Sequence, residues 1–315
     1  TGITKAAYTN LHNWYGGVAS LNTKIAEGIT LDVGVDLRTY KGSHFRVLND
    51  LLGGDAYRDN LTDSDGDINA PQPNIITNTY SVRPSINPFW SSDYQEKIAY
   101  NTDSKINWLG AFAQLEYSKN NLTAFVQGAF SQEAFKRIDY FRFTDASGDQ
   151  ETGFKKLVGG NIKAGLNYNI NENHNLFVNS GYYSKQPFMY AVYPFGRNYV
   201  NDNLTNEKIV GMELGYGFHS LKFTTNLNLY RTTWEDRFQT VGDRTVVTGT
   251  LENPNGYFSY EGLSETHQGA ELDFNFKPIN KLMVNGMLSY GNWFYNGNAT
   301  STRYTVSNQL FGAGA

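Results

Sequence analysis

The feature of this sequence that most constrains its fold is an alternation of apolar and polar residues, which recurs in about ten segments of roughly ten residues each. Alternation with a period of two places successive side chains on opposite faces of a β-strand, whereas an amphipathic helix repeats about every 3.6 residues. The segments are joined by connections that are in turn very short and very long. This pattern predicts an all-β chain built from antiparallel hairpins.

The clearest of these segments runs from Ile29 to Tyr40. One of its faces requires lipid or a protein core, and the other requires water. The apolar face carries Ile29, Leu31, Val33, Val35 and Leu37, and the polar face carries Thr30, Asp32, Gly34, Asp36 and Arg38. Similar segments are Trp14–Ile25, Ile106–Tyr117, Leu122–Phe135, Asn161–Asn169, Leu176–Tyr183, Val210–Phe218, Leu221–Thr233, Ala270–Lys277 and Leu282–Tyr290.

The connections distinguish between the two folds that such strands can build. A soluble β-sandwich also alternates, so alternation alone leaves it open. Here tight polar turns at 26–28, 119–121, 171–173, 219–220 and 278–281 regularly separate long stretches at 41–104, 136–157, 185–208 and 234–267. Long links on one side only are typical of a transmembrane antiparallel up-and-down β-barrel of the outer-membrane type.

In such a barrel the short turns face the periplasm and the long loops are extracellular. Strands of about ten residues match the thickness of the hydrocarbon layer when they are tilted. The chain contains no run of about eighteen apolar residues, so we expect no membrane-spanning helix.

Composition removes several other classes of protein. The 315 residues include no cysteine, which excludes disulfides and thiolate chemistry. The net charge is −4 and Lys and Arg form no stripe, so nucleic acid is not an expected partner. The 22 Tyr, 20 Phe and 5 Trp exceed ordinary usage. Six of them near strand ends, Trp14, Tyr15, Trp108, Tyr117, Tyr290 and Trp293, suit the aromatic girdles of a barrel.

Both ends of the sequence look cut. Thr1 begins neither a signal peptide nor a translated chain, and the residues from Gln309 to Ala315 become small where a last strand would be expected. An open sheet of ten or eleven strands would leave two rows of unpaired amides in lipid. Either the rest of the barrel lies outside this sequence or the chain closes as a small barrel of about ten strands; the ragged ends favour the first.

Two stretches carry a resemblance to a known family. The run from Asp36 to Arg46 with the following Asp50–Asp55, and the run from Thr233 to Phe238 with the later Glu265–Leu272, resemble segments of TonB-dependent receptors of the Bacteroidetes outer membrane. The resemblance extends from about Trp14 to Tyr290. It implies a 22-stranded barrel, a plug domain inside it and a TonB box that engages an energised inner-membrane complex.

On this resemblance, residues 1–315 are an incomplete arc of about 10–11 strands, with the plug domain and the final strands absent. The implied function is active import of a scarce glycan, peptide or siderophore through long extracellular loops, with no enzymatic activity. The alternative is a structural barrel subunit of a larger outer-membrane assembly, paired with a surface lipoprotein or secretion machinery. A third hypothesis is a passive porin with fewer strands.

One acidic loop suggests a metal. Asp63, Asp65, Asp67 and Asn69 place side-chain oxygens at every second position, as calcium loops do. The spacing does not fit the EF-hand template, and turns rich in Asp, Asn and Gly are also common as ordinary solvated loops. Calcium is the only cofactor that the sequence suggests.

Aromatic residues in the long loops suggest a ligand. Trp90, Tyr94, Tyr193, Phe195 and Arg197 would bring rings and an arginine to the extracellular mouth, and such platforms suit sugars, peptides or siderophores. The alternative is that these rings pack the loops onto one another or onto a partner protein. On the strands, Lys163, Glu213, Glu271 and Asp273 fall on the polar face, where we expect a wet barrel wall.

The histidines suggest no chemistry. His12, His44, His174, His219 and His267 have no metal-ligand spacing. Ser264 lies near His267, but closeness in sequence does not define a nucleophile and its base.

A substitution tests the assignment of the two faces. Val33→Arg should destabilise the protein by about 2–4 kcal/mol if Val33 lies near the middle of a bilayer. The same change at Asp32 or Gly34 should be tolerated better, because these residues lie on the polar face. Folding into lipid vesicles measures the difference, and equal tolerance of the change on the two faces would overturn the assignment.

Overall fold

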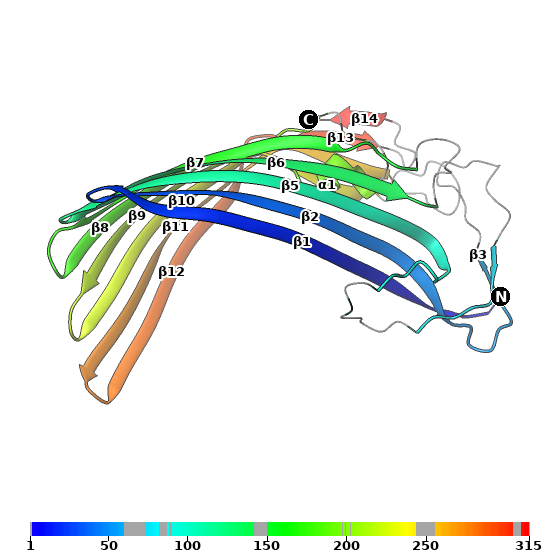
Figure 1. Ribbon diagram of the computed structural model, residues 1–315, viewed down its shortest axis with the longest axis horizontal. Helices are drawn as coiled ribbons and strands as arrows, with labels where there is room; N and C mark the ends of the chain where they lie inside the picture. The colour runs from blue at the N-terminus through cyan, green and yellow to red at the C-terminus, as the bar shows by residue number, and fades with distance from the viewer. Residues whose placement is uncertain are drawn as a thin grey trace.

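The computed structural model describes residues 2–59, 74–81, 87, 90–141, 150–196, 198, 200–201, 203–243, 256–304 and 310–314. These residues form one large antiparallel sheet and a two-stranded one (Figure 1). The large sheet contains β1 (Lys5–Ala26), β2 (Ile29–Asp50), β5 (Lys97–Lys119), β6 (Leu122–Asp139), β7 (Lys155–Asn169), β8 (His174–Lys185), β9 (Glu207–His219), β10 (Phe223–Asp243), β11 (Gly256–Ile279), β12 (Leu282–Asn296), β13 (Thr300–Tyr304) and β14 (Leu310–Gly314). The small sheet pairs β3 (Tyr57–Asp59) with β4 (Asn74–Ile76).

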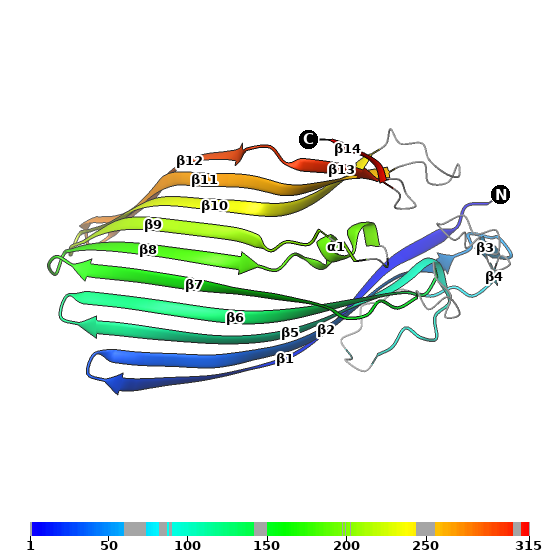
Figure 2. The ribbon, with the colours of Figure 1, turned by 90° about the horizontal axis from the view of Figure 1, so that it is seen from above.

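The large sheet runs up and down in chain order, with β12 and β13 following one another along the same side of β11. All five short turns lie at one end of the sheet, and the long connections lie at the other (Figure 2). The predicted hairpins and the all-β fold are therefore confirmed. Among the described residues β1 pairs only with β2, so the sheet is an open arc and the small closed barrel is wrong.

The register places apolar residues of neighbouring strands side by side on one face, here called the outer face. Val35 lies opposite Ala111, and Ala111 lies opposite Phe130. This belt continues across the arc and its larger side chains are exposed to the surroundings, as at Leu37, Leu109, Val126, Phe130, Ile162, Leu166, Val178, Leu214 and Leu229. In the described part of the chain, no helix has the length and apolar character to span a bilayer.

The opposite face, here called the inner face, is polar and internally bonded. Glu213 accepts hydrogen bonds from Asn179 Nδ2 at 3.2 Å and from Asn228 Nδ2 at 2.6 Å, which joins three strands. Asn226 Nδ2 donates to Asp273 Oδ1 at 3.0 Å. The division into two faces follows the predicted alternation.

Three of the predicted girdle residues face inward. Trp14, Trp108 and Trp293 lie opposite Tyr40, Arg38 and His267, which share the inner face, so their assignment to a lipid-facing girdle is wrong. Tyr15, Tyr117 and Tyr290 lie on the outer face and are exposed. Position near a strand end did not distinguish these two groups, but parity along the strand does.

Beyond the belt, the strands continue for many residues and the loops cover both of their faces. Phe45 and Val47 lie on one face of β2 and Leu48 on the other, and all three are 0–1% exposed. Leu48 packs with Ile76 and Ile98, while Phe135 packs with Val192 and Tyr193. These two small cores hold the long connections against the strand tips.

On the inner face, phenylalanine rings pack over glycines of the neighbouring strand. Phe112 covers Gly34, Phe125 covers Gly165 and Phe177 covers Gly215. A Cβ at Gly34 would lie 2.3 Å from Phe112 Cζ, so Gly34→Arg would also displace this ring and is a poor control for the assignment of the faces. Asp32 remains a suitable inner-face control.

Two glycines of β9 test this packing on the same strand and the same face. A Cβ at Gly215 would lie 2.1 Å from the Phe177 ring, whereas the nearest atom to a Cβ at Gly211 is 3.8 Å away. Gly215→Ala should therefore destabilise the protein by about 1–2 kcal/mol, since the ring must leave its rotamer. Gly211→Ala should change stability by less than about 0.5 kcal/mol. Equal midpoints in denaturant for the two variants would contradict this packing.

Candidate functional site

The candidate site is a group of charged and aromatic side chains on the inner face, at the loop end of β8 to β12. Lys185 Nζ lies 2.7 Å from Glu207 Oε2, and Arg237 Nε lies 2.8 Å from Glu207 Oε1. Arg237 also pairs with Glu265, whose other oxygen lies 2.6 Å from His267 Nε2. This chain of ion pairs crosses four adjacent strands.

A bulge in β10 directs Arg237 into this chain. The pairing with β11 shifts between Trp234 and Arg237, and Asp236 adopts a left-handed conformation with φ of 58°. A bulge inserts an extra residue on one strand and re-aims the side chains that follow. Arg237 thereby reaches carboxylates on both neighbouring strands.

An aromatic stack lies next to the ion pairs. The His267 ring lies between Trp234, at 4.6 Å between centroids, and Trp293, at 5.2 Å with an interplanar angle of 26°. Trp293 Nε1 donates to Tyr230 OH at 3.4 Å. Trp293 is 66% exposed on β12, which pairs only with β11 among the described residues.

A shallow depression of about 550 Å³ adjoins the aromatic stack on the inner face. Its polar lining includes Lys163, Glu213 and Glu271, three of the four residues predicted for the wet wall. Tyr183 and Tyr230 add two rings, and Lys163 Nζ lies 5.6 Å from the Tyr183 ring centroid. The depression therefore offers charges of both signs beside aromatic surface.

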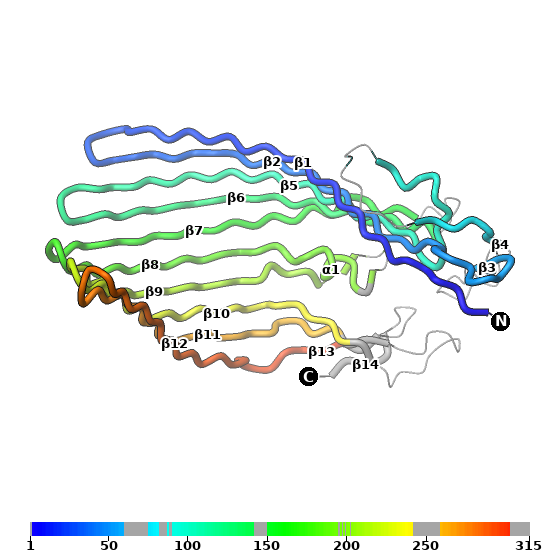
Figure 3. Tube along the Cα trace, turned by 90° about the horizontal axis from the view of Figure 1, so that it is seen from below, coloured from blue at the N-terminus to red at the C-terminus, as the bar shows by residue number. Residues whose placement is uncertain are grey.

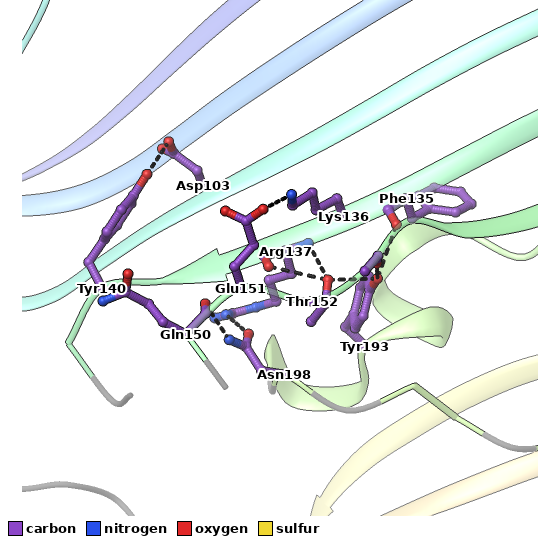
Figure 4. Close-up of polar contacts among 11 residues, drawn as sticks. Asp103, Phe135, Lys136, Arg137, Tyr140, Gln150, Glu151, Thr152, Tyr193 and Asn198 are labelled. Carbon is purple, nitrogen blue, oxygen red and sulfur yellow. Dashed lines mark hydrogen bonds and ion pairs between the residues drawn. The ribbon is translucent and has the colours of Figure 1, made fainter. Parts of the chain in front are cut away.

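The connection between β8 and β9 folds back over the inner face. It contains the short helix α1 (Met189–Val192) and a 3₁₀ turn (Pro194–Gly196). Tyr193 anchors it, because its hydroxyl donates to Phe135 O at 3.1 Å and bonds with Thr152 Oγ1 at 3.0 Å (Figure 4). Gln186 adds a bond from its Nε2 to Ser131 Oγ at 2.8 Å.

Arg137 ties two long connections to β6 (Figure 4). Its guanidinium lies 3.1 Å from Asp139 Oδ2 and donates to Asn198 Oδ1 at 2.7 Å. Thr152 N donates to Arg137 O, and Asn198 Nδ2 donates to Gln150 O. Because these groups are buried or half-buried and bonded to one another, they hold the loops in place.

The ligand residues predicted from sequence are dispersed. Trp90 and Tyr94 lie close together, with ring centroids 6.4 Å apart, and Tyr94 is 66% exposed. Trp90 lines a cavity of about 260 Å³ with Lys41 and other outer-face residues, away from the inner face. Tyr193 is 1% exposed, so its ring is not open to a ligand and the alternative of loop packing describes it.

Three other predictions lie partly or wholly beyond what the structure describes. Phe195 belongs to the 3₁₀ turn, but its side chain is outside the described residues, and so is Arg197. The calcium candidates Asp63, Asp65, Asp67 and Asn69 also lie outside them. Across the described ranges, no three His, Asp or Glu side chains gather as metal ligands would.

The arrangement supports binding rather than catalysis. Ser264 and His267 are separated by an odd number of positions on β11, with no register shift between them, so they face opposite sides of the sheet. A signal for the inner-face site was present in the sequence. Trp234 lies two residues after Thr232, and Trp293 four after Ser289, so extending the alternation places both rings on the polar face.

Two tyrosines, the buried Tyr193 and the partly exposed Tyr140, give the loops a predicted pH dependence. Burial raises the pKa of Tyr193, and burial together with the charge of Asp103, whose Oδ2 accepts a bond from Tyr140 OH at 2.9 Å, raises the pKa of Tyr140. Because the folded pKa is the higher one, their stabilisation is complete below pH about 10 and is lost as the pH rises through the folded values.

Absorbance titration of tyrosinate should therefore show both groups ionising above the ordinary value. Subtracting the absorbance titration of Tyr193→Phe from that of the wild type should give a curve with a midpoint above pH 10. The same subtraction for Tyr140→Phe should also give a midpoint above pH 10. A difference curve centred on pH 10 would contradict the burial of Tyr193 or the contact of Tyr140 with Asp103.

Comparison with known proteins identifies a family with this architecture. The family model described as "TonB dependent receptor-like, beta-barrel" matches residues 2–313. A search of curated protein sequences finds no match.

Solved structures with a similar fold include copper transporter OprC, with a TM-score of 0.61, 12% identity, and 95% of this chain and 43% of that chain covered. For FpvAI in its complex with pyocin S2, the TM-score is 0.56 and the identity 12%, with 95% of this chain and 37% of that chain covered. For BauA, the ferric preacinetobactin receptor of Acinetobacter baumannii, the TM-score is 0.51 and the identity 10%, with 95% of this chain and 41% of that chain covered. The chain thus spans less than half the length of these structures, and at this identity they show the fold alone. The family match over nearly all of its residues shows that the chain belongs to the TonB-dependent receptor β-barrel family.

Proposed function

We propose that this chain is part of the wall of an outer-membrane active importer, which binds a scarce ligand at its extracellular side. The family consists of receptors and transporters rather than enzymes. The expected energy source is the TonB complex, acting through a plug domain in another part of the protein. Residues 1–315 would then be one arc of the barrel, with its long connections outside the cell.

The apolar belt supports the membrane placement. Its side chains are exposed in the isolated arc and lie in lateral rows from β1 to β12, which is the surface that a lipid layer would cover. Burying them would remove a large apolar area from water. The polar inner face would line the lumen.

The observation that carries the proposal is the inner-face site at the loop end. The exposed ring of Trp293 can stack on a sugar ring or another flat group, and the neighbouring Glu265, Arg237 and Lys185 can bond its polar substituents. This combination suits a glycan, a peptide with aromatic residues or an aromatic siderophore. Trp90 and Tyr94 remain proposed as contacts for approaching ligands outside the lumen.

Uptake by cells that express the full receptor tests the proposal. A panel of oligosaccharides, peptides and ferric siderophores would each be supplied as the limiting nutrient. At least one should support growth only when the receptor and TonB are both present. A barrel that is needed for assembly of a surface lipoprotein, but supports no TonB-dependent growth, would favour the structural alternative.

Two residues of β12 then test the site. Trp293→Ala should weaken binding of that ligand by about tenfold, since one stacked ring contributes roughly 1–1.5 kcal/mol. Tyr290→Ala is the matched control, because Tyr290 lies three residues away on the outer face and is 75% exposed. Equal affinities for the two variants would place the ligand elsewhere on the receptor.

A further inference from the structure

Three lysines form a row on the outer face, just beyond the apolar belt. Lys41 of β2 lies directly opposite Lys105 of β5, which in turn lies opposite Lys136 of β6. No register shift separates this row from Leu37 and Leu109, and the spacing of four residues keeps the lysines on the same face as the belt. Lys156 of β7 is exposed on the same face two residues nearer to the belt, opposite Ala134.

Like charges directly opposite each other on a sheet are unfavourable, so the row requires negative partners. Two of the lysines have them within the chain. Lys41 Nζ lies 2.8 Å from Asp103 Oδ2, and Lys136 pairs with Glu151 and lies 5.4 Å from the Phe154 ring. Lys105, in the middle, has no ion pair with any acidic residue in the part of the chain that the structure describes.

Polar groups next to the row can also donate hydrogen bonds. Thr39 and Asn107 lie opposite each other between the belt and the lysines. Thr39 Oγ1 donates to Asn107 Oδ1 at 2.9 Å, which occupies the amide oxygen of Asn107 and leaves its N–H groups available. Lys105 and Asn107 therefore both present donors to the surroundings of the barrel, not to its lumen.

The height of the row matches a particular layer of the membrane. The row lies four residues beyond the last apolar pair, Leu37 and Leu109. At about 3.3 Å per residue and a tilt of about 40°, this is roughly 10 Å along the membrane normal. Headgroups begin immediately outside the hydrocarbon layer, and a Lys side chain reaches several ångströms.

We propose that Lys105, with Lys41, Lys136 and Asn107 around it, binds a phosphate group of an anionic lipid in the outward-facing leaflet. A phosphate oxygen accepts charge-assisted bonds from ammonium groups and from amide N–H, and it supplies the negative charge that the row lacks. The inference rests on the proposed membrane placement, because only that orientation brings headgroups to this row.

The test uses the full-length receptor in detergent micelles and lipid A that carries two phosphates. Adding this lipid should raise the thermal midpoint of the wild type, and lipid A without phosphates should not. Lys105→Glu should weaken the apparent affinity by about tenfold or more, and Lys105→Gln by about fivefold, since each basic residue near an anionic surface contributes about 1 kcal/mol.

Lys119→Glu is the matched control, because Lys119 lies on the same strand and the same face at the short-turn end, and forms only an exposed pair with Glu27 at 3.7 Å. It should behave like the wild type. Equal affinity of Lys105→Glu and the wild type would overturn the proposal, as would an equal midpoint shift with inorganic phosphate alone.

Two further readouts keep the outcomes separable. Gel mobility with and without heating reports whether each variant forms a folded barrel. If Lys105→Glu does not fold, the test uses Lys105→Gln and the salt dependence of the wild type. The rise of the thermal midpoint caused by lipid A must then become smaller as the salt concentration rises. Nutrient uptake is measured independently. Loss of lipid binding with normal uptake would leave the importer intact, and loss of uptake with normal lipid binding would contradict only the importer.

Discussion

The requirement that every backbone amide in an apolar layer must find a partner governs this structure. Within such a layer an unsatisfied N–H or C=O costs several kcal/mol, so strands must pair continuously with their neighbours. The ladder of β1 with β2 runs without a register shift from Ala6 to Lys24, and that of β5 with β6 does so along its whole length, so both meet this requirement. Continuous pairing fixes the register, and the register in turn decides which side chains meet lipid and which meet the lumen.

The part of the fold inside the apolar layer was predictable from sequence, and the part beyond it was not. Ile29–Tyr40 was identified because one face of it is apolar and the other is polar, but β2 continues to Asp50. There Phe45, Val47 and Leu48 are all buried because loops cover both faces, so the contrast that reveals a strand disappears.

The candidate site was missed for a related reason. Its members come from five strands, β8 to β12, and their assembly depends on the bulge after Trp234, which no alternation predicts. Tyr193 shows the opposite error. A loop that is rich in aromatic residues was read as a ligand platform, whereas two hydroxyl bonds and the contact with Phe135 bury this ring. Composition reports which side chains are available, but only tertiary contacts decide which remain exposed.

The unequal strand lengths give the barrel an uneven rim. β8 and β9 have 12 and 13 residues, whereas β5 has 23 and β11 has 24 (Figure 3). A difference of this size amounts to roughly 35 Å along a strand. The strand pairing therefore ends early at β8 and β9, with Lys185 as the last residue of β8 and Glu207 as the first of β9. The connection between them lies against this edge, with Phe188 and Ala191 beside Lys185 and Glu207, so a folded loop with one short helix, not a strand, forms this part of the rim.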